Sequence, residues 1–296
     1  MNDDIRAQAN YYDRFRRVLV YIDNHLQEAV DLEELSHVAA FSKFHFHRQW
    51  SQMFGITVAK YIQLRRLKRA AFQLAFRSAE PVLHIAFDSG FEGPEAFARA
   101  FKRNFGQTPS EFRAEPEWQK WQQVYATSNQ LREAHMSTQW QIHDVKIINF
   151  SETPVAALTH TGDPQLIGDS IRRFIEWRKQ NRLPPRISAT FNLVYDDPDD
   201  VDPTQHRMDL CAATNQPVLP NEFGVVAKTI PAGRCAVLRH VGSDDTLRNT
   251  VGFLYRQWLP QSGHECRDFP LFFQRVSFFP DVPEHEAITD VFLPLR

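Results

Sequence analysis

A pattern that occurs twice within the first 113 residues constrains the fold of this chain more than any other feature. Three residues recur at an offset of 50 and seven more at an offset of 51. The first copy contains Leu35, Ala40, Phe41, Phe46, Arg48, Trp50, Phe54, Gly55, Thr57 and Tyr61, and the second contains Ile85, Gly90, Phe91, Phe97, Arg99, Phe101, Phe105, Gly106, Thr108 and Phe112. Such a repeat indicates two copies of one supersecondary unit.

Helix signals within the first copy identify the unit as a helix-turn-helix. Asp31, followed by Glu34 three residues later, predicts the capping box of one helix. Ser42 predicts the N-cap of the next helix, which should end at Gly55. Apolar residues at helical spacing predict one long helix from about Val58 to Phe76, which would join the two copies.

The chain changes character after the second copy. Residues 115–142 are polar and irregular, and they predict a linker between an all-α domain at 8–114 and a second domain at 143–296. The second domain contains short β-type runs and two helical stretches, and these recur at an offset of 80. We therefore expect a multidomain chain whose C-terminal α+β domain consists of duplicated strand-helix-strand units with an antiparallel sheet. A cleft between the two halves would suit a small molecule.

The segment from Ala40 to Gly55 raises the question of a histidine site. His45 and His47 are two residues apart, so on a helix they diverge by roughly 200° and cannot hold one ion. No Cys, Ser or carboxylate is spaced to orient either imidazole for catalysis. Neither a metal nor a cofactor is expected, and ordinary surface histidines remain one alternative.

A nucleic-acid surface explains the same segment better. The aromatic stripe of Phe46 and Trp50 faces the core, which leaves Arg48 at the centre of the exposed face. Arg99 takes the same place in the second copy. No acidic residue lies between Glu34 and Glu80, whereas eight Lys and Arg residues do. A local basic field of this kind suits a polyanion, although a solvated basic helix face is the simpler alternative.

The repeat resembles the AraC/XylS family of transcription regulators. LSHVAAFSKFHFHRQWSQMFG and IAFDSGFEGPEAFARAFKRNFGQTPSEFR carry this resemblance, which covers about residues 11–113. It implies two reading helices near 42–54 and 94–105 that enter successive major-groove segments. The expected DNA-binding residues are Lys43, Phe44, His45, His47, Arg48, Gln52, Arg65, Arg66, Pro94, Glu95, Arg99, Lys102 and Arg103. Arg65, Arg66 and Lys102 would hold phosphates, and Arg48 would bind a guanine edge.

The C-terminal domain resembles GyrI-like proteins, in the domain order of Rob-like regulators. YDDPDDVDPTQHRMDLC, FLYRQWLPQSG and ITDVFLPL carry the resemblance. It implies a small amphipathic ligand held between aromatic side chains, often beside a buried Glu. Phe273, or Gln274 with a shift of one residue, stands where that Glu is expected, which favours a neutral or anionic ligand, or none. The candidate ligand-binding residues are Trp177, Tyr195, Trp258 and Phe272, each with plain core as its alternative.

Together these features predict a sequence-specific DNA-binding transcription regulator that is not an enzyme. Two alternatives remain, namely a GyrI-like hydrolase fused to a DNA-binding module, and an architectural or inhibitory binding protein. Double-stranded DNA is the expected partner, with RNA polymerase and a small amphipathic ligand as further candidates. A cytoplasmic location is expected, because the sequence shows no secretory signal, no membrane-length apolar run and no paired cysteine motif.

Overall fold

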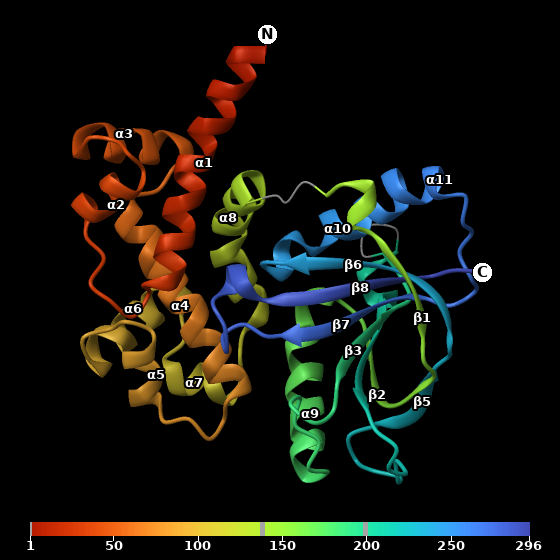
Figure 1. The fold of residues 1–296 in the computed structure, drawn as a ribbon. Coiled ribbons are helices and arrows are strands. Elements are labelled where there is room, and N and C mark those ends of the chain that lie inside the picture. Colours follow the sequence, from red (N-terminus) through yellow and green to blue (C-terminus); the bar gives the residue numbers. More distant parts are fainter. Residues whose placement is uncertain (1, 137–139, 198–200) are drawn as a thin grey trace. The chain divides into compact units, whose positions relative to one another are not determined.

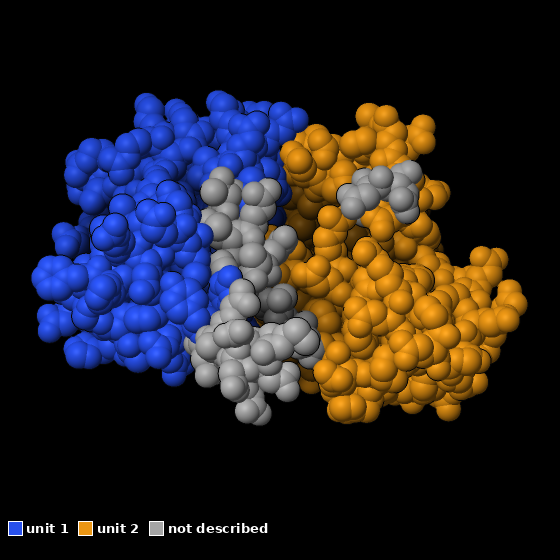
Figure 2. All heavy atoms as spheres, turned by 90° about the horizontal axis from the view of Figure 1, so that it is seen from above, with its two compact units in different colours: residues 1–138, 283–285 blue, residues 139–282, 286–296 orange. Residues whose placement is uncertain are grey.

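The computed structural model describes the backbone of residues 2–136, 140–197 and 201–296. The chain forms two compact units (Figure 2). Unit 1 comprises Met1–Thr138 with Pro283–His285, and unit 2 comprises Gln139–Val282 with Glu286–Arg296. Among the residues with a described backbone, no helix is both long and apolar enough to span a bilayer.

Unit 1 is helical (Figure 1), and it has two hydrophobic cores, one for each copy of the repeat. Its helices are α1 (Asn2–Asn24), α2 (Leu32–Val38), α3 (Lys43–Phe54), α4 (Val58–Phe76), α5 (Val82–Asp88), α6 (Pro94–Phe105), α7 (Pro109–Ala114) and α8 (Trp118–Met136). Helix α4 belongs to both cores, because Tyr61 packs in the first and Leu67 in the second. The predicted pair of helix-turn-helix units joined by a long helix is confirmed.

Local capping signals set the helix ends largely as predicted. Asp31 and Ser42 cap α2 and α3 by accepting backbone N–H bonds, and Gly55 ends α3 in the left-handed conformation at φ 64°. The predicted capping box is only half formed, because the Glu34 carboxylate accepts from the Tyr21 hydroxyl instead. That hydrogen bond is the main cause that raises the pKa of Tyr21 to about 12.

The turn inside each helix-turn-helix unit uses one residue with positive φ. Ala40 holds this position in the first unit at φ 53°, and Gly90 holds it in the second at φ 76°. In the second turn the Phe91 N–H donates to the Ala86 carbonyl at 3.0 Å, and the first turn has the same bond fifty residues earlier. The sequence repeat therefore reproduces the backbone of the turn.

The predicted linker at 115–142 is wrong over much of its length. Helix α8 occupies Trp118–Met136, and Trp118, Trp121 and Tyr125 are buried in the second core of unit 1. These aromatic residues follow each other at helical spacings of three and four, which places them on one face among polar neighbours. The polar average of the segment concealed this narrow apolar stripe. Residues 137–139, which also fall in the predicted linker, lie outside the described residues.

Unit 2 is built around one antiparallel sheet of eight strands within the described residues, in the order β1-β6-β8-β7-β3-β4-β2-β5. The strands are β1 (Lys146–Phe150), β2 (Thr153–Thr161), β3 (Thr190–Val194), β4 (Arg207–Ala213), β5 (Val226–Ile230), β6 (Gly233–Val241), β7 (Leu271–Ser277) and β8 (Ile288–Pro294). Helix α9 (Ile167–Gln180) follows β2, and α10 (Leu247–Phe253), a π-helical turn (Leu254–Trp258) and α11 (Leu259–Ser262) follow β6. The predicted duplication of an α+β unit is confirmed.

The strand order shows how the two halves combine. The first strand of each half pairs with the other half, since β1 pairs with β6 and β5 with β2. Only Ser151 and Glu152 separate β1 from β2 in the chain, yet these strands are first and seventh in the sheet. The sheet must therefore curl until its two ends approach each other. The interior of the curl is filled by apolar side chains that include Cys211 and Cys235.

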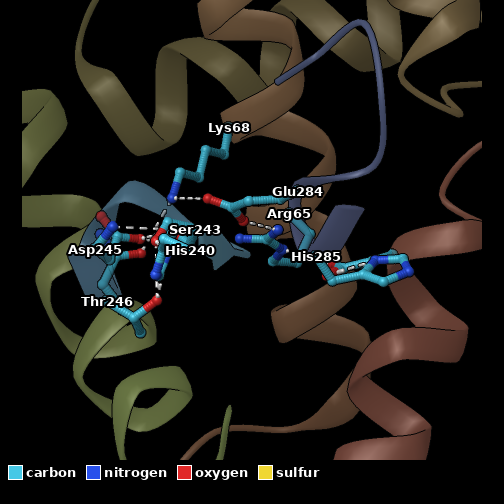
Figure 3. A network of polar contacts seen from close by, with 10 residues as sticks. Arg65, Lys68, His240, Ser243, Asp245, Thr246, Glu284 and His285 are labelled. Atoms are coloured by element: carbon cyan, nitrogen blue, oxygen red, sulfur yellow. Dashed lines mark hydrogen bonds and ion pairs between the residues drawn. The ribbon is translucent and has the colours of Figure 1, made fainter. Parts of the chain in front are cut away.

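A buried histidine recurs in both halves of unit 2. His240 Nδ1 lies 2.7 Å from the Thr250 hydroxyl and Nε2 lies 2.9 Å from the Ser243 carbonyl, part of the network in Figure 3. His160 makes the corresponding contacts in the first half. Burial lowers the pKa of His240, so the neutral ring ties its strand to the following helix.

Candidate nucleic-acid interface

Helix α3 separates a core stripe from an exposed face. Phe46, Trp50 and Phe54 are buried against α1 and α4, with at most 1 % of their surface exposed. The opposite face carries Phe44, which is 88 % exposed, and Arg48, which is also exposed. Phe44 does not contribute to the core, so its ring is available to a partner beside Arg48.

Helix α6 repeats this arrangement with different outward residues. Phe97, Phe101 and Phe105 form its buried stripe, and Pro94 occupies the first helical position as predicted. The exposed face carries Pro94, Glu95, Arg99, Lys102 and Arg103. Both helices thus present an arginine at the centre of an exposed face, in the place that the helical phase predicts.

The central arginines are available to a ligand. Within the described part of the chain, neither Arg48 nor Arg99 makes a hydrogen bond or an ion pair. His45 and His47 are exposed on the two flanks of α3, and Ala96 and Ala98 take their places on α6. Lys43, at the start of α3, is exposed and lies 4.0 Å from Glu33, and Gln52 is exposed one turn beyond Arg48.

Lys60 joins this surface, although the predicted set did not include it. Its ammonium donates to Asn104 Oδ1 at 2.6 Å and so connects the first turn of α4 to α6. Burial lowers the pKa of Lys60, and the neighbouring charge of Arg103 lowers it further. A phosphate bound beside Lys60 and Arg103 would reduce the repulsion between these two cations. Lys60 could have been predicted from the sequence, because it lies in the stretch between Glu34 and Glu80 that contains basic but no acidic residues.

Arg65 is not available to phosphates, contrary to the prediction. Its side chain is 2 % exposed, and its Nε lies 3.1 Å from Asp23 Oδ1. A second bond runs to Glu284, which also accepts from Lys68 at 2.8 Å (Figure 3). Helical phase alone could not show that α1 and the segment Pro283–His285 place carboxylates against this face of α4.

Arg66 is also committed to the fold. Its guanidinium donates to the carbonyl oxygens of Leu26 at 2.8 Å and Glu28 at 2.6 Å, which fixes the connection after α1. Burial lowers the pKa of Arg66. The prediction of a phosphate contact for Arg66 therefore gives way to a structural role.

The expectation that four aromatic residues line one pocket in unit 2 is not met. Trp177 points from α9 into one core, Trp258 ends the π-helical turn after α10 and lies in another, and Phe272 lies inside the curl of the sheet. All three are buried, and each belongs to a different cluster. The plain-core alternative holds for these three, because aromatic content alone does not separate a core from a pocket.

Tyr195 differs from the other three candidates because it is 37 % exposed. Its hydroxyl donates to Asp209 Oδ2 at 2.7 Å, and the same buried carboxylate accepts from Lys228 at 2.6 Å. Burial and the bond to Asp209 raise the pKa of Tyr195. These contacts connect β3, β4 and β5, which is a structural role.

Comparison with known proteins bears on both units. The family described as "GyrI-like small molecule binding domain" matches residues 143–296. The chain belongs to the GyrI-like family. A "Helix-turn-helix domain" family matches residues 35–115.

Individual relatives match parts of the chain. "Probable transcriptional regulator YgiV" of Escherichia coli K-12 is 40 % identical over 153 residues, 51 % of this chain and 96 % of that protein. "Right origin-binding protein" of the same organism is 29 % identical over 146 residues, 49 % of this chain and 47 % of that protein. A solved structure of an EcmrR-DNA complex covers 91 % of this chain and 85 % of its own, with 15 % identity and a TM-score of 0.44.

The coarse function follows from the two family matches and the geometry of unit 1. The chain is a DNA-binding transcription regulator with an AraC-type helix-turn-helix region and a GyrI-like domain, in a Rob-like arrangement. The resemblance read from the sequence is confirmed at this level.

Proposed function

We propose that this regulator binds a specific DNA site by placing α3 and α6 in two successive segments of the major groove. One observation carries the proposal: both helices bury an aromatic stripe, and each presents at the centre of the opposite face an exposed arginine without a partner among the described residues. An arginine in a major groove donates two hydrogen bonds to the O6 and N7 atoms of guanine. Because one chain carries both helices, a single copy reads a site without two-fold symmetry.

The contacts around the central arginines divide by chemistry. Lys43, Lys60, Lys102 and Arg103 provide positive charge for phosphates, which positions the helices and makes binding salt-dependent. Phe44, His47 and Arg48 on α3, together with Pro94, Glu95 and Arg99 on α6, face the base edges. His45 and Gln52 lie at the sides of the first groove contact.

Substituting Arg48→Ala or Arg99→Ala is expected to weaken binding to the selected site by about 1–3 kcal/mol and to relax the guanine preference at one position. Affinity for random duplex should change far less, because the phosphate contacts remain. Titration by gel shift or fluorescence anisotropy, at two or more salt concentrations, measures both effects.

Arg296→Ala is the matched control, because it removes the same charge from an exposed pair with Glu265 in unit 2. It should leave specific affinity unchanged. Unaltered specific binding by both Arg48→Ala and Arg99→Ala would contradict the site assignment. Selection from random duplexes that returned no consensus would favour the architectural alternative.

For unit 2 we propose binding of a small amphipathic molecule that is neutral or anionic. The family description supports a small-molecule role. Phe273, where the family carboxylate is expected, is nearly buried, and the Arg275 guanidinium lies 5.7 Å from its ring centroid. Arg275 Nε also donates to Asn192 Oδ1 at 2.9 Å. The Arg275 guanidinium also forms an ion pair with Asp244, so the feature that disfavours a cation is the apolar Phe273 in place of the family carboxylate.

Isothermal titration of the full chain with an anionic aromatic sulfonate and with a cationic dye of similar size tests this ligand class. We expect the anion to bind about tenfold or more tightly than the cation, a difference of about 1.4 kcal/mol. Tighter binding of the cation would contradict the proposed class.

A further inference from the structure

The two reading helices share their length, their buried aromatic stripe and their central arginine, but they carry opposite kinds of side chain one turn before that arginine. Phe44 and Glu95 are both the second residue of their helix, and both are exposed. Four residues later, α3 has Arg48 and α6 has Arg99. The buried stripes also coincide, so the two backbones present these positions in the same way.

Resting on the proposed function above, we propose that Phe44 and Glu95 make the two half-sites different. Helix α3 selects a thymine beside the guanine that Arg48 binds. Helix α6 selects a cytosine beside the guanine that Arg99 binds. The common arginine and the residue four positions before it thus define a base step in each half of the site.

The exposure of Phe44 supports selection of thymine by α3. The Phe44 side chain is 88 % exposed, so it buries almost no apolar surface against the protein. Its counterpart on α6 is Glu95, which shows that the fold does not need an apolar residue at this position. In the major groove the C5-methyl group of thymine is the apolar feature of a base pair. A phenyl ring in the N-terminal turn of a reading helix reaches base edges.

The charge of Glu95 supports selection of cytosine by α6. A carboxylate is repelled by phosphates, and in the groove it only accepts hydrogen bonds, for which cytosine N4 is a donor. Glu before Arg at i and i+4 favours an ion pair within a helix. Among the described residues, however, the Glu95 and Arg99 side chains have no hydrogen bond or ion pair. Both groups are therefore presented outward.

Exchanging the two residues tests the proposal. The full-length wild type, Phe44→Glu and Glu95→Phe are each selected against random duplexes, and the bound sequences are counted. We expect Phe44→Glu to change the preference beside the first guanine from thymine to cytosine by about tenfold, without altering the second half. Glu95→Phe should make the reverse change in the second half only. Glu95→Gln, which adds an amide donor, should move that preference toward adenine.

Arg296→Ala again serves as the control, since it changes an exposed residue of unit 2 and no residue of either reading helix. It should leave base identity at both steps unchanged. Thermal unfolding of each variant should match the wild type, because the exchanged positions are exposed.

The outcomes separate the two proposals. In one outcome, the wild type selects a consensus whose bases beside the guanines stay the same in the Phe44→Glu and Glu95→Phe variants. That result overturns the inference and leaves the proposed function intact. A wild type that yields no consensus overturns the proposed function itself. A consensus that lacks thymine or cytosine at these steps also overturns the inference.

Discussion

Gly90→Ala is expected to destabilise unit 1 by more than about 3 kcal/mol, the range reserved for buried clashes and incompatible backbone. Gly90 sits at φ 76°, where an L side chain is strained. A Cβ atom there would lie 2.0 Å from the Leu26 carbonyl oxygen and 2.8 Å from Arg66 Nε. The carbonyl is backbone that Arg66 itself binds, so relief requires the second turn to move away from the end of α1. Urea unfolding followed by tryptophan fluorescence measures the loss.

The first copy of the repeat supplies the control for this prediction. Ala40 holds the equivalent turn position with φ 53°, so Ala40→Gly removes strain and should stabilise unit 1, by no more than about 1 kcal/mol. A Gly90→Ala protein as stable as wild type would show that the turn can open at little cost. The same protein should also lose specific DNA binding, because the turn sets the angle of α6.

The difference between these two turns shows which features of the fold the sequence predicts and which it does not. The helices of unit 1 follow from local signals, since Ser42, Gly55 and Pro94 each act on the turn in which they occur. The repeat then identified Ala40 and Gly90 as equivalent turn positions in the two copies. The close approach of Leu26 to Gly90 is a tertiary contact between segments 64 residues apart, and no local pattern encodes it.

Unit 2 shows the same limit more strongly. The repeat at an offset of 80 predicts two similar halves, but not that β1 and β5 exchange places at the sheet edges. That exchange closes the curl, buries Phe272 inside it, and puts Trp177 and Trp258 in separate cores. Aromatic content therefore did not predict a ligand site in unit 2. Helical periodicity, in contrast, correctly predicted that Arg48 and Arg99 lie on exposed helix faces.

Arg65 is expected from the sequence to bind phosphate, but in the structure its side chain is buried against Asp23. Arg65→Met should destabilise unit 1 by about 3–5 kcal/mol, because Asp23 is then buried without its ion-pair partner. Asp23 is 3 % exposed, and its other carboxylate oxygen lies 3.9 Å from Nδ1 of the His285 imidazole. Glu284 keeps its bond from Lys68 at 2.8 Å, so most of the loss arises at Asp23.

A double-mutant cycle separates this structural role from the phosphate contact that the sequence suggested. Asp23→Leu alone leaves Arg65 buried with one carboxylate fewer, but the combination of Asp23→Leu with Arg65→Met replaces a buried ion pair by apolar groups and should recover most of the lost stability. Specific DNA affinity should recover with it, and the dependence of affinity on salt should equal that of the wild type. If Arg65 instead binds a phosphate, the double variant will stay weak and its salt slope will fall by about one. Urea unfolding and anisotropy titrations on the same four proteins decide between these results, since stability and salt slope move independently.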